Sequence, residues 1–315
     1  MATFIQQHGE PQIPPPYRFP NVSICSFRLS AEISALTALC DEVLNACGTL
    51  NQRGFEYRAA LPFVDLEILT YPRMQSEAPG FEDIGYTVQR ELYFRLFVAK
   101  FISGNPVPTE IAVFMPYILV DNTWSLISGR EVIGYPKVRA SFKPASPSEC
   151  YSITVKADAY ETYGRNEQLA LKPLVKVGPK PLSNRTVFPA YKWPWGVIDK
   201  LIDVGTLDPN VVKVLRTSQM LNIFSTIQLK QIRDAENMTL ACYQALIHAE
   251  FQAMDIVGPN PLPPAQLTIY SYASLPIVER LGLASAVSTP LNPLLQYSLT
   301  CNLWFGNAAN LFVCP

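Results

Sequence analysis

The sequence predicts a β-rich α+β protein in which antiparallel strands close into a barrel-like arrangement flanked by a few helices. Short strand-like segments recur along the chain with turn residues between them, and helical patterns are few. Of the 315 residues, 49% are hydrophobic and only 16% are charged. This composition is typical of a globular protein, and the chain is long enough to bury a sizeable core.

Ten segments have the alternation or the apolar runs expected of strands. They cover residues 22–27, 61–71, 92–101, 111–120, 133–142, 151–163, 222–234, 240–254, 266–272 and 296–305. We expect 222–234 and 240–254 to pair as a hairpin across residues 235–237. The proline-rich residues 258–264 are interpreted as a loop and not as a domain linker, because the strands after them are too short to form a second core.

Helices are expected at four places, each marked by a capping or periodic pattern. Ser30 can cap a helix that runs to about residue 45, and Asp121-Asn122-Thr123 can cap a short helix over 124–128. Two more are expected at 196–203 and from Asp208-Pro209 onward. Five prolines among residues 1–20 predict an extended N-terminal arm, and 21–315 then form a single domain.

Charge and hydropathy argue against several classes of partner. A net charge of −1 gives no electrostatic reason to bind nucleic acid or an anionic membrane. The longest apolar runs are too short to span a bilayer, and residues 1–15 lack the apolar core of a signal peptide. We therefore expect a cytoplasmic protein without a nucleic-acid or membrane partner.

Cysteine and histidine limit the chemistry. The seven cysteines are odd in number and lack Cys-x-x-Cys spacing, which predicts reduced and mostly buried thiols. With only His8 and His248, a zinc site built on histidines is nearly excluded, and no metal is expected. His248 is interpreted as a hydrogen-bonded structural residue. Chemistry must then rest on lysine, carboxylates, arginine or tyrosine.

One lysine lies in an otherwise mostly uncharged, strand-forming segment, residues 129–140. On a strand, Tyr135, Lys137 and Arg139 share one face and Val138 takes the other. An amine buried beside apolar neighbours is harder to protonate and becomes a nucleophile near neutral pH. A lysine in such a place is more often a surface residue near a turn. The surrounding motif therefore has to decide between a surface lysine and a buried nucleophile.

Gly129-Arg130-Glu131 and Gly134-Tyr135-Pro136-Lys137 resemble the signature of the acetoacetate decarboxylase family. That family is itself a standard example of an activated lysine. The resemblance implies that Lys137 forms a Schiff base inside the cavity of a closed β-barrel or cone, without a metal or organic cofactor. The founding decarboxylases have a second lysine next, where this chain has Val138.

The resemblance also implies acidic residues near the lysine. Residues 63–68 look like the family strand that carries an active-site glutamate, which makes Glu67 the match. Val88 or Gln89 falls where the second glutamate is expected, and Glu91 is the acid that can replace it with a shift. We assign Glu67 and Glu91 to the catalytic site together with Lys137.

Substrate-binding residues are expected around the same lysine. Arg139 can hold a substrate carboxylate or repel the charged form of Lys137, and Tyr135 and Gln89 are the other polar candidates. The family's carboxylate-binding arginine has no clean match near the first strand. Arg28 and Arg18 are both candidates, and Arg28 is the one we assign.

We thus expect a homo-oligomeric Schiff-base enzyme that acts on a keto acid or related small carbonyl compound, most simply a decarboxylase of specialised metabolism. The nearest alternative is an aldolase, dehydratase or cyclase on the same scaffold. A barrel that only binds a hydrophobic ligand, with Lys137 as a hydrogen-bond donor, is the alternative from another class.

Overall fold

The computed structural model describes residues 13–144, 152–179, 223–283, 291 and 293–314. The helices expected at 196–203 and from Asp208, and residues 1–12 of the expected arm, lie outside this part of the chain. The described protein is mostly β, with a few short helices. Its division into an arm and one domain stays a prediction, although the first strand already begins at Tyr17.

Twelve strands form one mixed sheet. The elements in chain order are β1 (Tyr17–Ser30), α1 (Ile33–Val43), α2 (Leu50–Arg53), β2 (Phe55–Ala59), β3 (Phe63–Ser76), β4 (Thr87–Ile102), β5 (Glu110–Val120), α3 (Thr123–Ser128), the π-helix η1 (Gly129–Ile133), β6 (Lys137–Pro144), β7 (Ile153–Ala159), β8 (Ala170–Pro179), β9 (Ile223–Arg233), β10 (Ala241–Pro261), β11 (Ala265–Ile269), α6 (Ile277–Arg280) and β12 (Leu295–Val313).

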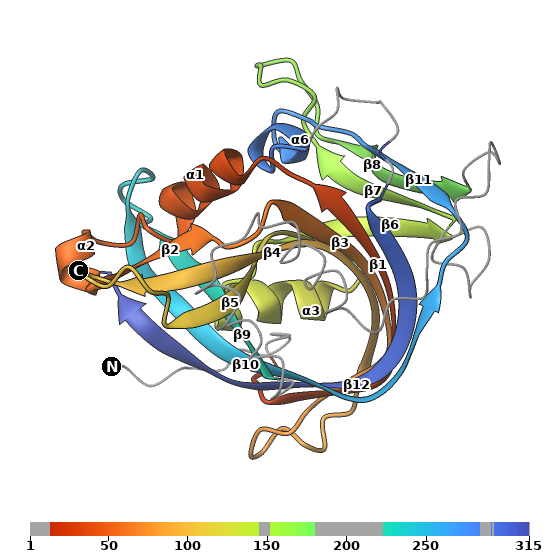
Figure 1. The fold of residues 1–315 in the computed structure, drawn as a ribbon, viewed down its shortest axis with the longest axis horizontal. Helices are drawn as coiled ribbons and strands as arrows, with labels where there is room; N and C mark the ends of the chain where they lie inside the picture. The colour runs from red at the N-terminus through yellow and green to blue at the C-terminus, as the bar shows by residue number, and fades with distance from the viewer. Residues whose placement is uncertain (1–12, 145–151, 180–222, 284–290, 292, 315) are drawn as a thin grey trace.

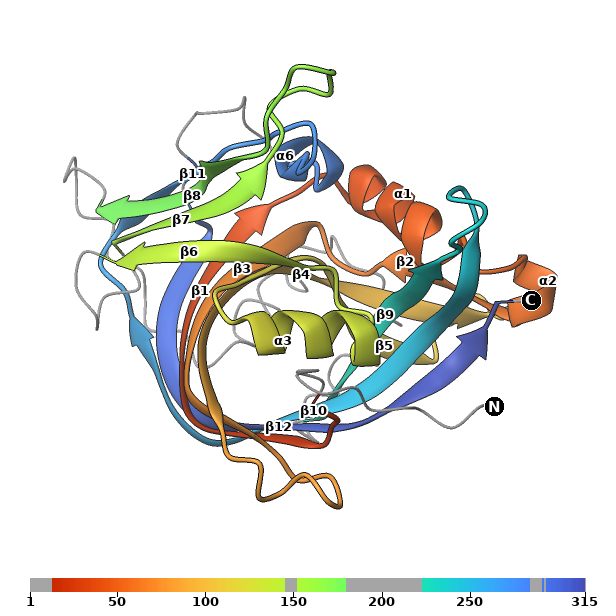
Figure 2. The same ribbon diagram turned by 180° about the vertical axis from the view of Figure 1, so that it is seen from behind.

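The strand pairings return to their starting point. From β5 they run through β9, β10, β12, β1 and β3 to β4, and β4 pairs with β5 again, so seven strands form a ring. Strands β6, β7, β8 and β11 branch from the other end of β5, and they extend away from the ring in Figure 1. Helix α3 is seen within the outline of the ring from both sides (Figure 1, Figure 2).

The expectation of a purely antiparallel arrangement is wrong at β5. This strand pairs in parallel with β9 at residues 112–113 and with β6 at residues 118–120. A parallel pair needs a crossover connection. Between β5 and β6 this crossover consists of α3 and η1, so a helix and a tight turn lead directly into the strand that begins with Lys137.

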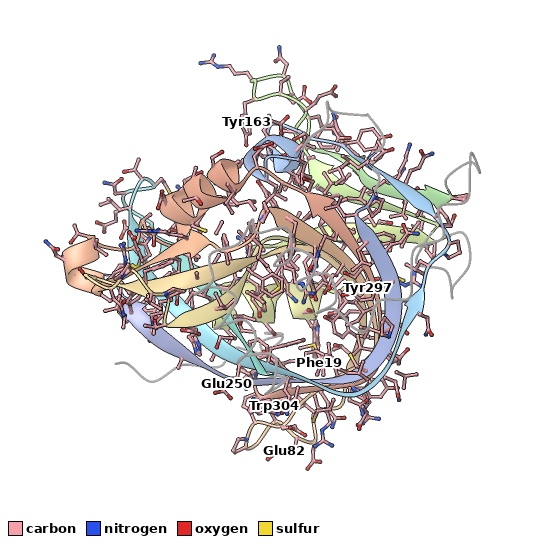
Figure 3. The ribbon with its side chains drawn as sticks, in the orientation of Figure 1. Phe19, Glu82, Tyr163, Glu250, Tyr297 and Trp304 are labelled. Atoms are coloured by element: carbon pink, nitrogen blue, oxygen red, sulfur yellow. A yellow bond between two sulfur atoms is a disulfide. The ribbon has the colours of Figure 1, made fainter. Side chains whose placement is uncertain are left out.

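Strands β3, β4 and β5 are buried on both faces over most of their length, which explains why they read as nearly continuous apolar runs. On β4, Leu92 and Phe94 face an outer core that includes residues of α1 and α6. The alternate residues Tyr93 and Phe97 face a separate inner core. Figure 3 shows Phe19 inside the ring with the inner-core side chains.

Local signals located most elements but misplaced some boundaries. The short helix after Asn122 and the β9–β10 hairpin are confirmed. Ser30 does not cap a helix, because it is the last residue of β1 and pairs with β3; α1 starts at Ile33. Residues 258–261 are not a loop but the end of β10, where Asn260 pairs with β12. Strands β2 and β8 were not expected.

The prediction of reduced thiols is wrong for at least one pair. Cys47 and Cys314 form a disulfide; their Cα atoms are 5.3 Å apart, and the two residues are 267 positions apart in the sequence. The Cα distance is well within the range for such a bond. Local spacing could not reveal this pair, because only the fold brings the end of the chain after β12 to the turn after α1. No described helix is long and apolar enough to cross a membrane.

Candidate active site

A cavity of about 800 Å³, measured as all the space between its lining atoms, opens inside the ring. Its wall combines residues from β1, β3, β4 and β5 with α3, η1 and β6, and is completed by β9, β10 and β12. Six of the polar or charged side chains that line it are Gln89, Glu91, Tyr93, Arg95, Lys137 and Thr226. The cavity therefore lies where the crossover from β5 to β6 meets the inner face of the sheet.

Lys137 is buried in this wall and hydrogen-bonded to two polar groups. Only 6% of the residue is exposed. Its Nζ donates to Glu91 Oε2 at 2.7 Å and to Ser125 Oγ at 2.8 Å. Ser125 is held in turn at the start of α3, where the Asn122 side chain accepts a hydrogen bond from its backbone N–H at 3.0 Å. The helix cap found in the sequence thus fixes one partner of the lysine.

The two glycines of the motif make room for this arrangement. A Cβ at Gly129 would lie 2.7 Å from both Cδ and Cε of Lys137, closer than side-chain atoms tolerate. Gly134 ends η1 with φ of +86°, and a Cβ there would lie 2.7 Å from Cα of Lys230 on β9. The first glycine admits the lysine side chain, and the second lets the turn pack against the neighbouring strand.

The rest of the motif fixes the turn that carries Lys137. Arg130 donates from Nη1 to the Lys137 carbonyl at 3.1 Å, so its role is structural. The Tyr135 N–H donates to the Gly129 carbonyl at 2.9 Å. Tyr135 precedes β6, but its side chain still lines the cavity, and burial raises the pKa of its phenol. Val138 faces the opposite way and packs against the outer core.

Strand β4 supplies a column of polar side chains along the cavity. Glu91 and Arg95 both line it, and Tyr93 lies between them on the same face. Tyr93 is directly opposite Ile118 on β5, and Ile118 is opposite Lys137 on β6. This register brings the column beside the lysine, although the two segments are more than 40 positions apart in the sequence.

Glu67 lies next to this column and does not contact Lys137. It accepts a hydrogen bond from the Tyr93 hydroxyl at 2.5 Å and pairs with Arg95 at 2.8 Å. Burial raises the pKa of Glu67, and the charge of Asp65 adds to this, while Arg95 and Tyr93 oppose it. Glu67 therefore does not line the cavity itself but holds two side chains that do, Tyr93 and Arg95.

Arg28 belongs to the same buried network. Its guanidinium donates two hydrogen bonds to Asp65, from Nε at 2.7 Å and from Nη2 at 2.8 Å, and lies 3.8 Å from the centre of the Phe63 ring. Arg95 approaches the same carboxylate at 3.4 Å. Burial alone would raise the pKa of Asp65, but the two arginines outweigh it and hold the pKa below its ordinary value.

The remaining candidates lie elsewhere. Arg139 is exposed and does not line the cavity. Arg18 is also largely exposed and pairs with Glu77. His248 lies within 3.0 Å of Glu110, again away from the cavity wall. The arginine that does line the cavity is Arg95, which the sequence analysis missed; its alternation with Glu91 on one strand is the signal that could have found it.

Aromatic rings form much of the apolar wall. The ring centres of Tyr17 and Phe305 are 5.9 Å apart, and those of Tyr135 and Phe305 are 6.1 Å apart. Phe19 and Tyr71 form another contact at 5.1 Å. Among the residues that the structure describes, no group of three histidines, cysteines or carboxylates is placed to hold a metal ion. The arrangement suits covalent chemistry by an amine next to a carboxylate.

Comparison with known proteins points to one family. The sequence profile of the family described as acetoacetate decarboxylase (ADC) matches residues 1–164. A solved acetoacetate decarboxylase is 14% identical, with 96% of this chain and 92% of that chain covered and a TM-score of 0.55. No curated protein matches the chain.

Two other solved structures show the same fold. For the acetoacetate decarboxylase of Legionella pneumophila the identity is 17%, the coverage is 94% of this chain and 88% of that chain, and the TM-score is 0.52. For an acetoacetate decarboxylase-like enzyme of Sphingomonas wittichii RW1 the identity is 13%, both chains are covered to 99%, and the TM-score is 0.52. At these identities the likeness concerns the fold alone.

Proposed function

Because the chain belongs to the acetoacetate decarboxylase family, we propose that it is a Schiff-base enzyme whose Lys137 forms an imine with a keto acid or related carbonyl compound. One observation carries the proposal. The Lys137 amine lies in a largely apolar cavity with a carboxylate at 2.7 Å and a hydroxyl at 2.8 Å. A nucleophile beside a general base in an enclosed site is the usual arrangement for covalent catalysis.

Imine formation needs the amine without its proton. Glu91 accepts the proton from the Lys137 ammonium, and the neutral Nζ attacks the carbonyl carbon of the substrate. The resulting carbinolamine loses water, with a proton returned to its hydroxyl by Glu91, and leaves an iminium ion on Nζ. Ser125 keeps the nitrogen in place through its hydroxyl.

The iminium then serves as the electron sink, so no step calls on a metal or an organic cofactor. In a β-keto acid the bond between the α-carbon and the carboxylate breaks, carbon dioxide leaves, and the bonding electrons move to give a neutral enamine. Protonation of the α-carbon restores the iminium. Water then attacks it, the carbon–nitrogen bond breaks, and ketone and free Lys137 are released.

Other cavity residues bind and orient. We assign Tyr135 and Gln89 to substrate contact, since both line the cavity. Glu67 and Arg28 hold the wall: Glu67 fixes Tyr93 and Arg95, and Arg28 fixes Asp65 behind them. A homo-oligomer working in cytoplasmic specialised metabolism is the setting that we propose for this chemistry.

The cavity also favours a second reaction on the same lysine. Aromatic rings form much of its wall and offer a place for a second, apolar reactant. An enamine on Lys137 can attack an aldehyde bound there instead of taking a proton. Aldol addition and dehydration are therefore the alternative to decarboxylation.

Reductive trapping tests the proposal. Incubation with a β-keto acid or β-diketone and borohydride converts the imine into a stable secondary amine, and peptide mass identifies its position. We expect one adduct on Lys137 and none in Lys137→Met. Loss of turnover by at least about a thousandfold is expected for that variant, because the covalent route is removed.

Lys230 provides the matched control. It is half-buried on β9, its Nζ lies 3.4 Å from the Val132 carbonyl, and burial lowers the pKa of its amine. Among the described lysines it is a neighbour that could be modified in place of Lys137. Lys230→Met should keep the adduct on Lys137. An adduct on Lys230 or spread over surface lysines, with none on Lys137, would contradict the proposal.

A further inference from the structure

Gln89 is buried in the cavity wall with an unused acceptor. It lies on β4 two residues before Glu91, so both side chains share the inner face of the strand. Only 3% of the residue is exposed, and it lines the cavity. Its Oε1 is buried and has no hydrogen-bond partner in the described part of the chain.

Three side chains in this region of the cavity, Tyr71, Phe19 and Met74, do not supply the missing donor. Tyr71, directly opposite on β3, directs its hydroxyl to Glu91 at 3.4 Å. Phe19 packs on the Tyr71 ring, and Met74 lines the same region of the cavity; neither has a polar hydrogen. A buried acceptor without a partner costs free energy, and in the wall of a cavity a bound molecule can remove that cost by donating a hydrogen bond.

We propose that Gln89 recognises a hydroxyl or N–H group of the substrate. The inference rests on the proposed reaction at Lys137 and adds the class of compound: an aldehyde or ketone with an apolar, ring-sized body and an uncharged hydrogen-bond donor at its far end. Alternate residues on a strand are about 7 Å apart. Gln89 is one such step from Glu91, the partner of the Lys137 amine. We therefore expect the donor roughly that distance from the reacting carbonyl carbon.

The charges around the cavity support an uncharged donor at the end of the substrate that meets Gln89. The Lys137 amine is already paired with Glu91, and Arg95 with Glu67 and Asp65. Gln89 adds an amide dipole without a net charge, so an extra ion beside it would lack a partner among the described residues. A neutral hydroxyl satisfies Oε1 at no such cost, while the aromatic rings nearby pack on the body of the molecule.

Three aldehydes with one skeleton test this inference. 4-(Hydroxymethyl)benzaldehyde has the donor, 4-(methoxymethyl)benzaldehyde keeps the oxygen but lacks its hydrogen, and 4-methylbenzaldehyde lacks both. The measurement is the aldehyde concentration that gives half-maximal cyanoborohydride trapping on Lys137. We expect the hydroxymethyl compound to need about a tenfold lower concentration than the other two, the effect of one buried hydrogen bond.

Two buried glutamines give a matched pair of variants. Gln89→Met keeps the length of the side chain but cannot accept the hydrogen bond, and should abolish the preference. Gln228 is also buried, with an unpartnered Nε2, but does not line the cavity; Gln228→Met should leave the preference intact. Met removes an unpaired polar group at each site, so both variants are expected to fold.

The outcomes separate the two proposals. If neither the aldehydes nor a β-keto acid or β-diketone modifies Lys137, the Schiff-base function itself is wrong; if only the aldehydes fail, the inference about the substrate is wrong and the Schiff-base function stands. If all three modify Lys137 at equal concentrations in the wild type, Lys137 is the nucleophile but Gln89 does not select the substrate. A preference that survives Gln89→Met would likewise overturn the inference, because the donor would then be bound elsewhere.

Discussion

Two clusters of buried charge lie on the inner face of the ring. They differ in how many oppositely charged groups surround the central residue, which is Lys137 in one cluster and Asp65 in the other. Lys137 has one carboxylate, Glu91, and one hydroxyl, and it borders the cavity. Asp65 has two guanidinium groups, with Arg28 bound through two hydrogen bonds and Arg95 at 3.4 Å. Similar burial thus accompanies a sparse cluster around Lys137 and a denser cluster of charges around Asp65.

This difference separates chemistry from support. A lysine amine can give up its proton, whereas a guanidinium stays charged and binds a carboxylate in a fixed planar geometry. The Lys137–Glu91 pair can therefore exchange a proton during a reaction. The cluster around Asp65 holds its charges in place and positions Arg95 and, through Glu67, Tyr93.

The largest expected effect comes from breaking the sparse cluster. Glu91→Gln removes the base beside Lys137 but keeps the shape of the side chain. Turnover of a keto acid that the wild type decarboxylates should fall by about 10²–10⁴-fold, the usual contribution of a general acid–base group. Trapping of Lys137 should slow as well, because Glu91 takes part in proton transfer during imine formation. Steady-state rates and peptide mass measure the two effects.

Turnover and trapping close to those of the wild type would argue against this role. Glu110→Gln is the matched control, since Glu110 is a partly buried carboxylate on β5 that pairs with His248 and does not line the cavity. Its turnover should match that of the wild type.

Breaking the denser cluster around Asp65 should instead cost stability. Asp65→Ala leaves Arg28 and Arg95 with less compensating negative charge in the core, and we expect a loss of about 3–5 kcal/mol in the free energy of unfolding. Denaturant titration measures it. Glu161→Ala, which removes a surface pair with Lys172, should change the unfolding free energy far less. A similar small change at Asp65 would show that its network is not structural.

Acid titration sharpens the same result. The folded-state pKa of Asp65 lies below its ordinary value of 3.8 because of the two arginines, which outweigh burial. Its contribution to stability is therefore complete above pH 3.8 and is lost as pH falls through the lower folded value. Asp65→Asn should lack this part of the acid dependence. An unchanged profile would mean that other carboxylates dominate it.

The sequence revealed the lysine more readily than its surroundings. The motif around Lys137 is local, and the strand alternation that put Glu91, Tyr93 and Arg95 on one face is local too. Long-range pairings decided the rest. The parallel pairing of β5 with β6 and β9, and the Cys47–Cys314 disulfide, depend on segments that no local pattern connects.

Some site residues were misplaced for a physical reason. Residues 133–142 were expected to be one strand, which gave Arg139 the same face as Lys137. Instead η1 occupies Gly129–Ile133, β6 begins only at Lys137, and the strand leaves the cavity within two residues, so Arg139 is exposed. Alternation predicts which face of a strand a residue takes, but not where that face stops bordering the cavity.

The smallest expected effect concerns the contact that positions the sparse cluster. Gly129 has helical backbone angles, φ −62° and ψ −42°, so Ala fits its backbone well and should not destabilise the fold. Its Cβ would nevertheless lie 2.7 Å from Cδ and Cε of Lys137. The lysine must shift, and its hydrogen bonds to Glu91 and Ser125 must lengthen.

We therefore expect Gly129→Ala to slow the trapping of Lys137 by about 10- to 100-fold, the effect of a displacement of about 1 Å in a reacting group. The melting temperature should stay close to that of the wild type. Gly164→Ala is the control, because a Cβ there meets no atom within 4 Å. If Lys137 is trapped as fast in Gly129→Ala as in the wild type, imine formation does not depend on the position that Glu91 and Ser125 give the amine. The proposed difference between Lys137, as a positioned nucleophile, and the Asp65 network, as a fixed support, would then be wrong.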